Sequence, residues 1–132
     1  MRKTIVHIVG VILLFSSYSI NAETIKTKKW ETIDIPFSTK VEASNPYEVK
    51  LSCTFINENS DTLIVPGFYN GNKQWVVRFT PNDTGLWKCI SQSSINSMDG
   101  IEKTIEVSEN NPDNPGSIQI KSDNPRVFSY ES

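Results

Sequence analysis

Histidine is almost absent from this sequence. Its 132 residues contain a single histidine, His7, which lies in a segment that we expect the mature protein to lose. A mature chain without histidine lacks the usual general base near neutral pH and the commonest metal ligand in proteins. The sequence contains no recognisable catalytic motif, and none of its Asp and Glu residues lies in one. We therefore expect no catalytic residues, no metal site and no cofactor, and we rank an independent enzyme last among the functions considered.

Long hydrophobic runs are limited to the N-terminal segment. Arg2 and Lys3 precede an apolar run from Ile8 to Phe15, and small and polar residues then lead to Ala22. This layout predicts a secretory signal peptide at residues 1–22 and a secreted or periplasmic location. A retained membrane anchor is the alternative, but the run is short for a hydrocarbon layer of about 30 Å.

A block of basic residues is also missing. Loss of residues 1–22 would leave 11 of the 13 basic residues beside all 15 acidic residues, so the mature net charge is near −4. A mildly acidic surface argues against nucleic acid and against anionic membranes as partners.

Cysteine is scarce, with Cys53 and Cys89 standing 36 positions apart. In an exported protein two thiols predict a disulfide. A crosslink over this span stabilises the fold by about 3–4 kcal/mol on the chain-entropy argument, less any strain. A redox pair or a metal site is the alternative, but the sequence has no Cys-x-x-Cys spacing and no mature histidine to support it.

No stretch has the periodicity of an amphipathic helix, and the hydrophobic pattern instead alternates with period two. This alternation predicts strands with one buried and one wet face. In the first clear strand the expected inward residues are Tyr47, Val49, Leu51, Cys53 and Phe55. Further strands are expected within residues 28–37, 62–69, 73–80, 86–91, 101–107, 117–120 and 126–130.

Turn signals separate these strands about every ten residues. Asn70-Gly71-Asn72 predicts a hairpin, because Asn and Gly tolerate positive φ. Pro66-Gly67 predicts an edge strand or a bulge, and Asp99-Gly100 predicts another turn. Many short strands with frequent turns predict an all-β fold, an antiparallel β-sandwich.

The domain boundaries follow from composition. Residues 109–116 contain two prolines, one glycine and three asparagines, as turn and linker segments do. We therefore expect one sandwich domain over residues 23–116. Residues 117–132 would add a C-terminal strand and the start of a linker.

The residues around Cys89 refine the fold prediction. Cys53 is expected on an early strand and Cys89 on a late one, and a disulfide between facing sheets is a hallmark of immunoglobulin-like sandwiches. Asp83 and Gly85 would make the turn into the late strand. Trp87 stands two residues before Cys89, where such domains usually have the tyrosine of the tyrosine corner, and its indole N–H can still donate a hydrogen bond.

Two tryptophans and an arginine have expected structural roles. Trp75 and Trp87 lie on inward alternations and are expected in the core, with Trp75 packing on the bridge from a neighbouring strand. Arg78 lies on the opposite face from Trp75, and a charged residue within an apolar strand usually pairs with a carboxylate. Asp83 is the expected partner.

The remaining aromatic residues are candidates for sugar stacking or for contact with another domain. Tyr69 and Asn70 are expected at the tip of a hairpin as an exposed pair. For Trp30 two positions are expected equally, one in the core and one at an interface with a following domain. A row of exposed aromatics containing Trp30 and Tyr69 would favour a carbohydrate-binding module.

The stretch VPGFYNGNKQWVVRFTPNDTGLWKC, residues 65–89, resembles a motif of the bacterial domain of unknown function 5060 (DUF5060). That motif combines a PGF-aromatic-x-G turn, W-x-V-R-F-x-P and G-x-W. The matching residues are Pro66, Gly67, Phe68, Tyr69, Gly71, Trp75, Val77, Arg78, Phe79, Pro81, Gly85 and Trp87. The segments SMDGIEKTIEV and NPGSIQIKSDNPRVFSY resemble later parts of the same family, so that the resemblance extends over about residues 30–130.

The resemblance implies an immunoglobulin-like domain placed before a TIM-barrel glycoside-hydrolase-like domain of a secreted bacterial enzyme. This chain would be the non-catalytic accessory part, either free-standing or truncated, and its partner would be the barrel. Two alternatives remain open, a stand-alone carbohydrate-binding module and a cell-surface adhesion or receptor-type domain. A polysaccharide is the ligand expected for the first of these alternatives.

Overall fold

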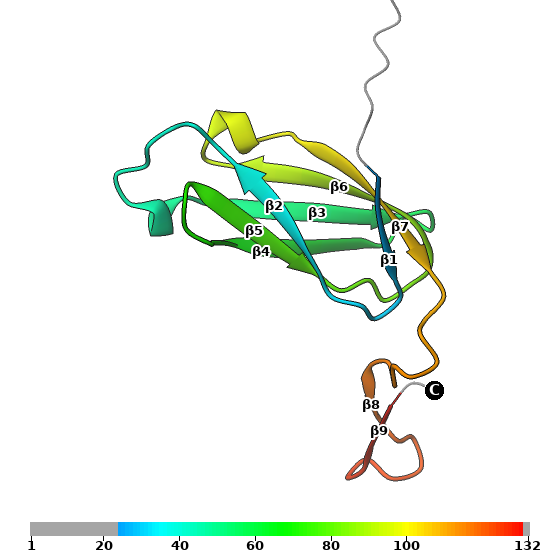
Figure 1. Ribbon diagram of the computed structural model, residues 1–132. Coiled ribbons are helices and arrows are strands. Elements are labelled where there is room, and N and C mark those ends of the chain that lie inside the picture. Colours follow the sequence, from blue (N-terminus) through cyan, green and yellow to red (C-terminus); the bar gives the residue numbers. More distant parts are fainter. Residues whose placement is uncertain (1–23, 131–132) are drawn as a thin grey trace, which may run out of the picture.

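The computed structural model describes residues 24–130, and these residues form nine strands and two short 3-10 helices (Figure 1). The predicted signal peptide lies outside the described residues. The strands are β1 (Thr24–Lys28), β2 (Ile33–Ser38), β3 (Leu51–Asn57), β4 (Thr62–Tyr69), β5 (Gln74–Phe79), β6 (Gly85–Ser93), β7 (Glu102–Ser108), β8 (Ile118–Ile120) and β9 (Phe128–Tyr130). The 3-10 helices are η1 (Pro46–Glu48) and η2 (Asn96–Met98). The all-β class is confirmed.

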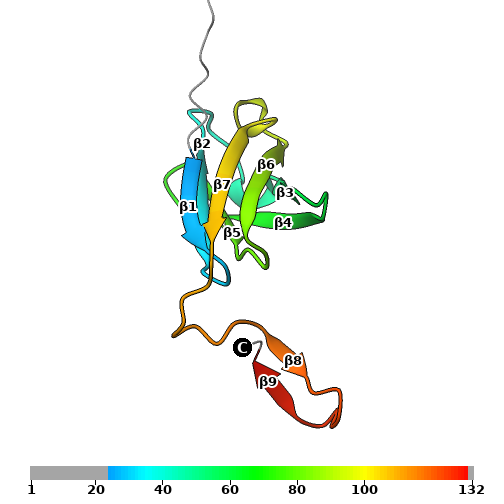
Figure 2. The same ribbon diagram turned by 90° about the vertical axis from the view of Figure 1, so that its right-hand side faces the viewer.

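Strands β1 to β7 form one continuous hydrogen-bonded order, β1-β7-β6-β3-β4-β5-β2. Neighbours are antiparallel except β1 and β7, which run parallel. The sheet curls so that β2 and β5 pack across β3 and β6 (Figure 1). We call residues 24–108 the body. Strands β8 and β9 pair with each other in a separate hairpin below it (Figure 2).

The core of the body consists of alternate residues from the inner faces of these strands. The predicted inward positions Leu51, Cys53 and Phe55 of β3 are buried, as are Trp75 and Trp87. The other buried apolar residues of the core are Ile35, Phe37, Val77, Phe79, Cys89, Met98, Ile105 and Val107. The period-two pattern therefore predicted the inner face of β3 and the burial of both tryptophans correctly.

The start of β3 differs from the prediction. Tyr47 is 82% exposed and belongs to η1, not to a strand with Phe55. The reason is local, because the Asn45 side chain accepts a hydrogen bond from the Tyr47 backbone N–H at 3.1 Å and Pro46 occupies the first helical turn. An Asn-Pro pair favours such a turn over a strand.

Strand β4 is neither an edge strand nor a simple bulge. Residues 62–66 pair with β3, whereas residues 67–69 pair with β5, so the strand changes partners at Pro66-Gly67. Proline cannot donate to a ladder, and a Cβ at Gly67 would lie 2.8 Å from Cδ2 of Leu51. The same two residues that suggested an edge thus mark the point where the sheet turns over the core.

The corner before β6 fits the prediction for Trp87. The indole N–H of Trp87 donates to the backbone oxygen of Asp83 at 3.1 Å. Gly85 has φ of +98°, a conformation that glycine adopts without a steric penalty. The Asn70-Gly71-Asn72 hairpin is likewise confirmed, with positive φ at Gly71 and Asn72.

Candidate interaction surfaces

The two cysteines lie side by side in one sheet. Cys53 is opposite Ser91 in the β3–β6 register, and Cys89 is opposite Phe55, so the cysteines form a diagonal pair on neighbouring strands. The prediction of a bridge between facing sheets was therefore wrong. An earlier strand, β2, occupies the facing layer and places buried Ile35 there, whereas the strand of Cys53 pairs directly with that of Cys89.

Both cysteines are buried and are free thiols in this structure. The distance between the two cysteines is 3.4 Å. A disulfide has an S–S bond length of about 2.0 Å, so the two residues are close but not bonded. The hydrogen bond with Cys89, together with burial, raises the pKa of Cys53 far above its ordinary value. The same hydrogen bond lowers the pKa of Cys89. Neither sulfur is accessible to solvent, so the pair cannot act on a substrate from this position.

Arg78 pairs with Asp34 and not with Asp83. The two residues are direct neighbours across β2 and β5, and Nε and Nη2 of Arg78 donate to the two carboxylate oxygens of Asp34 at 2.7 and 2.9 Å. Asp83 accepts a hydrogen bond from the backbone N–H of Thr84 instead. The prediction missed Asp34 because cross-strand register, not sequence distance, decides which carboxylate lies opposite an arginine.

The hydrogen bond from Arg78 holds the pKa of Asp34 below its ordinary value. A lowered folded-state pKa means that this pair contributes stability above the unfolded value near 3.9, and that the contribution is lost as the pH falls through the folded-state pKa. We expect Arg78→Met to raise the titration midpoint of Asp34, measured by NMR of the carboxyl carbon. Lys26→Met, which removes the partner of Glu106, is the control and should leave Asp34 unchanged. An Asp34 midpoint unaffected by Arg78→Met would contradict the assignment.

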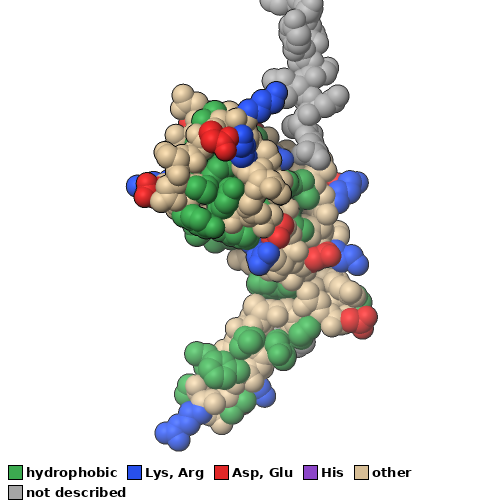
Figure 3. Space-filling view, turned by 60° about the vertical axis from the view of Figure 1, so that its left-hand side comes forward, with side chains coloured by type: hydrophobic (Ala, Val, Ile, Leu, Met, Phe, Trp, Pro, Cys, Tyr) green, Lys and Arg blue, Asp and Glu red, His purple; other side chains and the backbone are tan. Residues whose placement is uncertain are grey.

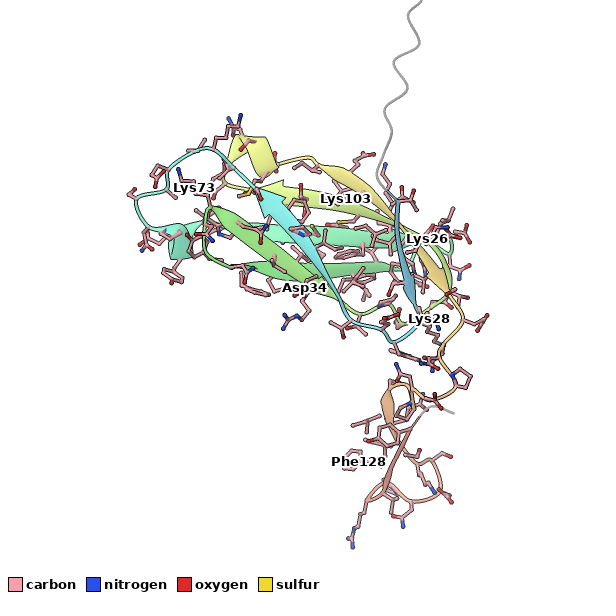
Figure 4. All side chains as sticks on the ribbon, viewed as in Figure 1. Lys26, Lys28, Asp34, Lys73, Lys103 and Phe128 are labelled. Atoms are coloured by element: carbon pink, nitrogen blue, oxygen red, sulfur yellow. The ribbon has the colours of Figure 1, made fainter. Side chains whose placement is uncertain are left out.

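Trp30 and Tyr69 do not form a common platform. Trp30 lies between β1 and β2, whereas Tyr69 ends β4. In the β2–β5 register Ile33 faces Phe79 and Ser38 faces Gln74, so the β1–β2 loop and the β4–β5 turn lie at opposite ends of β2. Figure 4 shows this separation, with Lys28 at the end of β1 and Lys73 in the β4–β5 turn on opposite sides of the body.

Tyr69 faces inward. It is half-buried, and its ring lies 5.0 Å from that of Trp75 and 5.5 Å from that of Tyr47. Asn70 is exposed, and its side chain donates to Gln74 at 3.2 Å. Tyr47, which the alternating pattern placed inside, is instead an exposed aromatic residue at this end. The preceding Asn-Pro pair was the signal that could have predicted its exposure.

Trp30 connects the body with the linker. It is half-buried, and its backbone N–H donates to the oxygen of Pro81 at 2.9 Å. Its own backbone oxygen accepts a hydrogen bond from the side chain of Asn114 at 3.2 Å. Both contacts involve the backbone of Trp30, so the two predicted positions of its side chain, in the core or at an interface with a following domain, stay predictions.

Among the exposed apolar surfaces of the described residues, two are candidates for contact with another domain. A shallow groove of about 430 Å³ on the outside of β3, β6 and β7 has Ile56 and Leu86 in its floor. An ion pair of 3.0 Å between Lys88 and Glu102 lies among its lining residues. The second surface is the β8–β9 hairpin, along which hydrophobic side chains gather in Figure 3.

The described residues contain no group of three potential metal-ligating side chains. Within residues 24–130 there is also no helix long and apolar enough to span a membrane.

Comparison with known proteins adds context to these surfaces. Residues 26–94 match the family described as domain of unknown function (DUF5060). A search of curated proteins finds no match. The fold resembles the crystal structure of a protein from Bacteroides vulgatus, described as a "putative glycoside hydrolase", with a TM-score of 0.73 and 30% sequence identity. The match covers 80% of this chain and 20% of the Bacteroides vulgatus chain, so this chain spans about a fifth of the length of that protein.

Proposed function

The chain belongs to the DUF5060 family, and from this membership we propose that it is a non-catalytic accessory domain of a secreted bacterial glycoside hydrolase. Its role is to pack against the hydrolase domain and hold it in position. No bond is made or broken by this chain. The mechanism is burial of apolar surface between domains.

The observation that carries this proposal is the coverage of the match. A fold like this one accounts for about a fifth of the Bacteroides vulgatus chain, which leaves four fifths of that chain for other domains. In support, Trp30 and Tyr69 lie at opposite ends of β2 and do not form the aromatic platform that sugar binding by these two residues would need. Exposed apolar side chains on the hairpin are what a packing role requires.

The immunoglobulin-like character of the sandwich is part of the proposal. It is supported by the curled seven-strand order, by the parallel edge strand β1 and by the hydrogen bond from Trp87 to Asp83 at the corner before β6. The disulfide is proposed as well, now between neighbouring strands β3 and β6. Cys53 and Cys89 are close enough to bond after a small movement, and export would expose them to an oxidising environment.

The experiment that tests the accessory role is a domain replacement. The Bacteroides vulgatus protein is prepared intact, without the matched fifth, and with that fifth replaced by residues 24–130 of this chain. We expect the truncated protein to melt at a lower temperature than the intact one, and we expect the replacement to recover most of the loss. A truncated protein as stable as the intact one would contradict the proposal.

A further inference from the structure

The C-terminal hairpin has one wholly apolar face. In the β8–β9 register Ile118 lies opposite Tyr130, and Ile120 lies opposite Phe128. Residues directly opposite each other point to the same side of a sheet, so these four side chains form one surface, which we call the apolar hairpin face. They are 57–69% exposed. Gln119 and Ser129 lie on the other side.

This hairpin is not covered by the rest of the described chain. Neither β8 nor β9 pairs with a strand of the body, and the hairpin projects away from it (Figure 2). An isolated two-stranded hairpin is marginally stable in water and needs a further layer against its apolar side. Apolar and polar residues therefore alternate in β8 and β9 as they do in a sheet that has one face buried against another layer.

The linker between β7 and the hairpin is attached to the body by a side-chain hydrogen bond. The Asn114 side chain donates to the backbone oxygen of Trp30 at 3.2 Å and accepts from the backbone N–H of Gly116 at 3.1 Å. The side chain of Asn110 donates to the backbone oxygen of Asn114 at 2.8 Å. The first of these contacts attaches the linker to the β1–β2 loop at one end of the body, and the other two join residues within the linker itself.

We propose that the apolar hairpin face docks on the hydrolase domain that comes after it in a longer polypeptide. The inference rests on the proposed function and identifies the surface that performs it. The body makes up about two thirds of the chain, so a structural match over 80% of the chain extends beyond the body. In the Bacteroides vulgatus protein the match leaves the remaining four fifths of the chain, which is enough to supply a covering domain.

The size of the face favours a tethered domain over a second copy of this chain. Each strand has three residues, so the face is about 10 Å long and two strands wide. Two such faces would bury a few hundred Å² per copy, compared with about 800 Å² per partner in a stable interface. A small patch is sufficient within one polypeptide, because the linker supplies a high effective concentration.

Hydrogen exchange measured by mass spectrometry tests this inference. In the purified chain we expect the hairpin amides to exchange rapidly, those of β3 and β6 to be protected, and the chain to be monomeric. In the replacement protein, with residues 24–130 on the Bacteroides vulgatus hydrolase domain, we expect protection of the hairpin to rise by at least about tenfold. Phe128→Asp should abolish that rise without changing the melting temperature of the purified chain. Ile64→Asp, which alters an exposed residue of the body, is the matched control and should leave the rise intact.

Three results would overturn the inference. The first is hydrogen exchange in the monomeric chain that is as slow at the hairpin amides as at those of β3. This result would overturn the inference even if the replacement protein does not fold. The second is protection that rises with chain concentration in step with dimer formation, which would identify a second copy as the occupant. The third is a replacement protein in which Phe128→Asp has no effect. If the wild-type replacement recovers stability and Phe128→Asp also does, the hairpin inference fails while the accessory function stands.

Discussion

Phe79→Ala is expected to lower the free energy of unfolding by about 3–5 kcal/mol, the range for removing a buried aromatic ring. Phe79 is 1% exposed and lies at the centre of the packing between the two layers of the sheet. Its ring is stacked on that of Phe55, with centroids 3.8 Å apart, and lies 5.3 Å from Trp87. Urea denaturation followed by tryptophan fluorescence measures the change.

Phe68→Ala is the matched control for this prediction. Phe68 is 42% exposed, and its described ring contact is with Arg78 at 5.5 Å. Its removal is expected to cost less than about 1 kcal/mol. Equal losses in the two variants would mean that β5 does not pack across β3 as described.

If the proposed Cys53–Cys89 bridge forms, its reduction in a chain produced by export is expected to lower the free energy of unfolding by about 3–4 kcal/mol, less the strain of closing a diagonal pair. For a domain of this size each kcal/mol corresponds to roughly 4–8 °C in Tm, so thermal unfolding with and without a reductant measures the effect. Alkylation of the denatured chain, read by mass, gives the thiol count independently. We expect no modified cysteine without reductant and two with it.

The double variant Cys53→Ala/Cys89→Ala is the control, and its Tm should not respond to reductant. Two alkylated cysteines in the exported, unreduced chain would contradict the proposed bridge. In that case the pair of buried free thiols is the native state, and reduction should leave the Tm unchanged.

Local alternation in the sequence predicted the strands well. Leu51, Cys53 and Phe55 are buried as expected, since a strand with one wet face has no other way to hide its apolar side chains. The Asn70-Gly71-Asn72 hairpin and the corner at Gly85 were also predictable, because Gly and Asn are among the few residue types that adopt a positive φ easily. The 3-10 turn at Tyr47 was missed, since Tyr47 also fits the alternation that continues into β3.

The errors concern which strands are neighbours. The sequence predicted Asp83 as the partner of Arg78 and facing sheets for the cysteines, but pairing depends on strand order, which alternation does not encode. The position of β2 opposite β5 places Asp34 beside Arg78 and leaves Cys53 next to Cys89 in one sheet. The change of partner at Pro66-Gly67 results from the same order.

For the candidate surfaces, too, the sequence predicted local features but not how the strands are arranged. Trp30 and Tyr69 were grouped by residue type, and the fold separates them by the length of β2. The alternation of the C-terminal strands was visible in the sequence. That both strands form an uncovered hairpin could not be inferred, because it requires knowing that no strand of the body pairs with them.

The central claim is that this chain supports a hydrolase and neither binds nor cleaves sugar itself. Titration of the purified chain with a panel of soluble plant polysaccharides, followed by tryptophan fluorescence and by release of reducing sugar, tests it most directly. The account predicts no saturable change in fluorescence and no sugar released from folded protein. A saturable change that is lost in Trp30→Ala or Tyr69→Ala, at unchanged Tm, would contradict it and identify a carbohydrate-binding module.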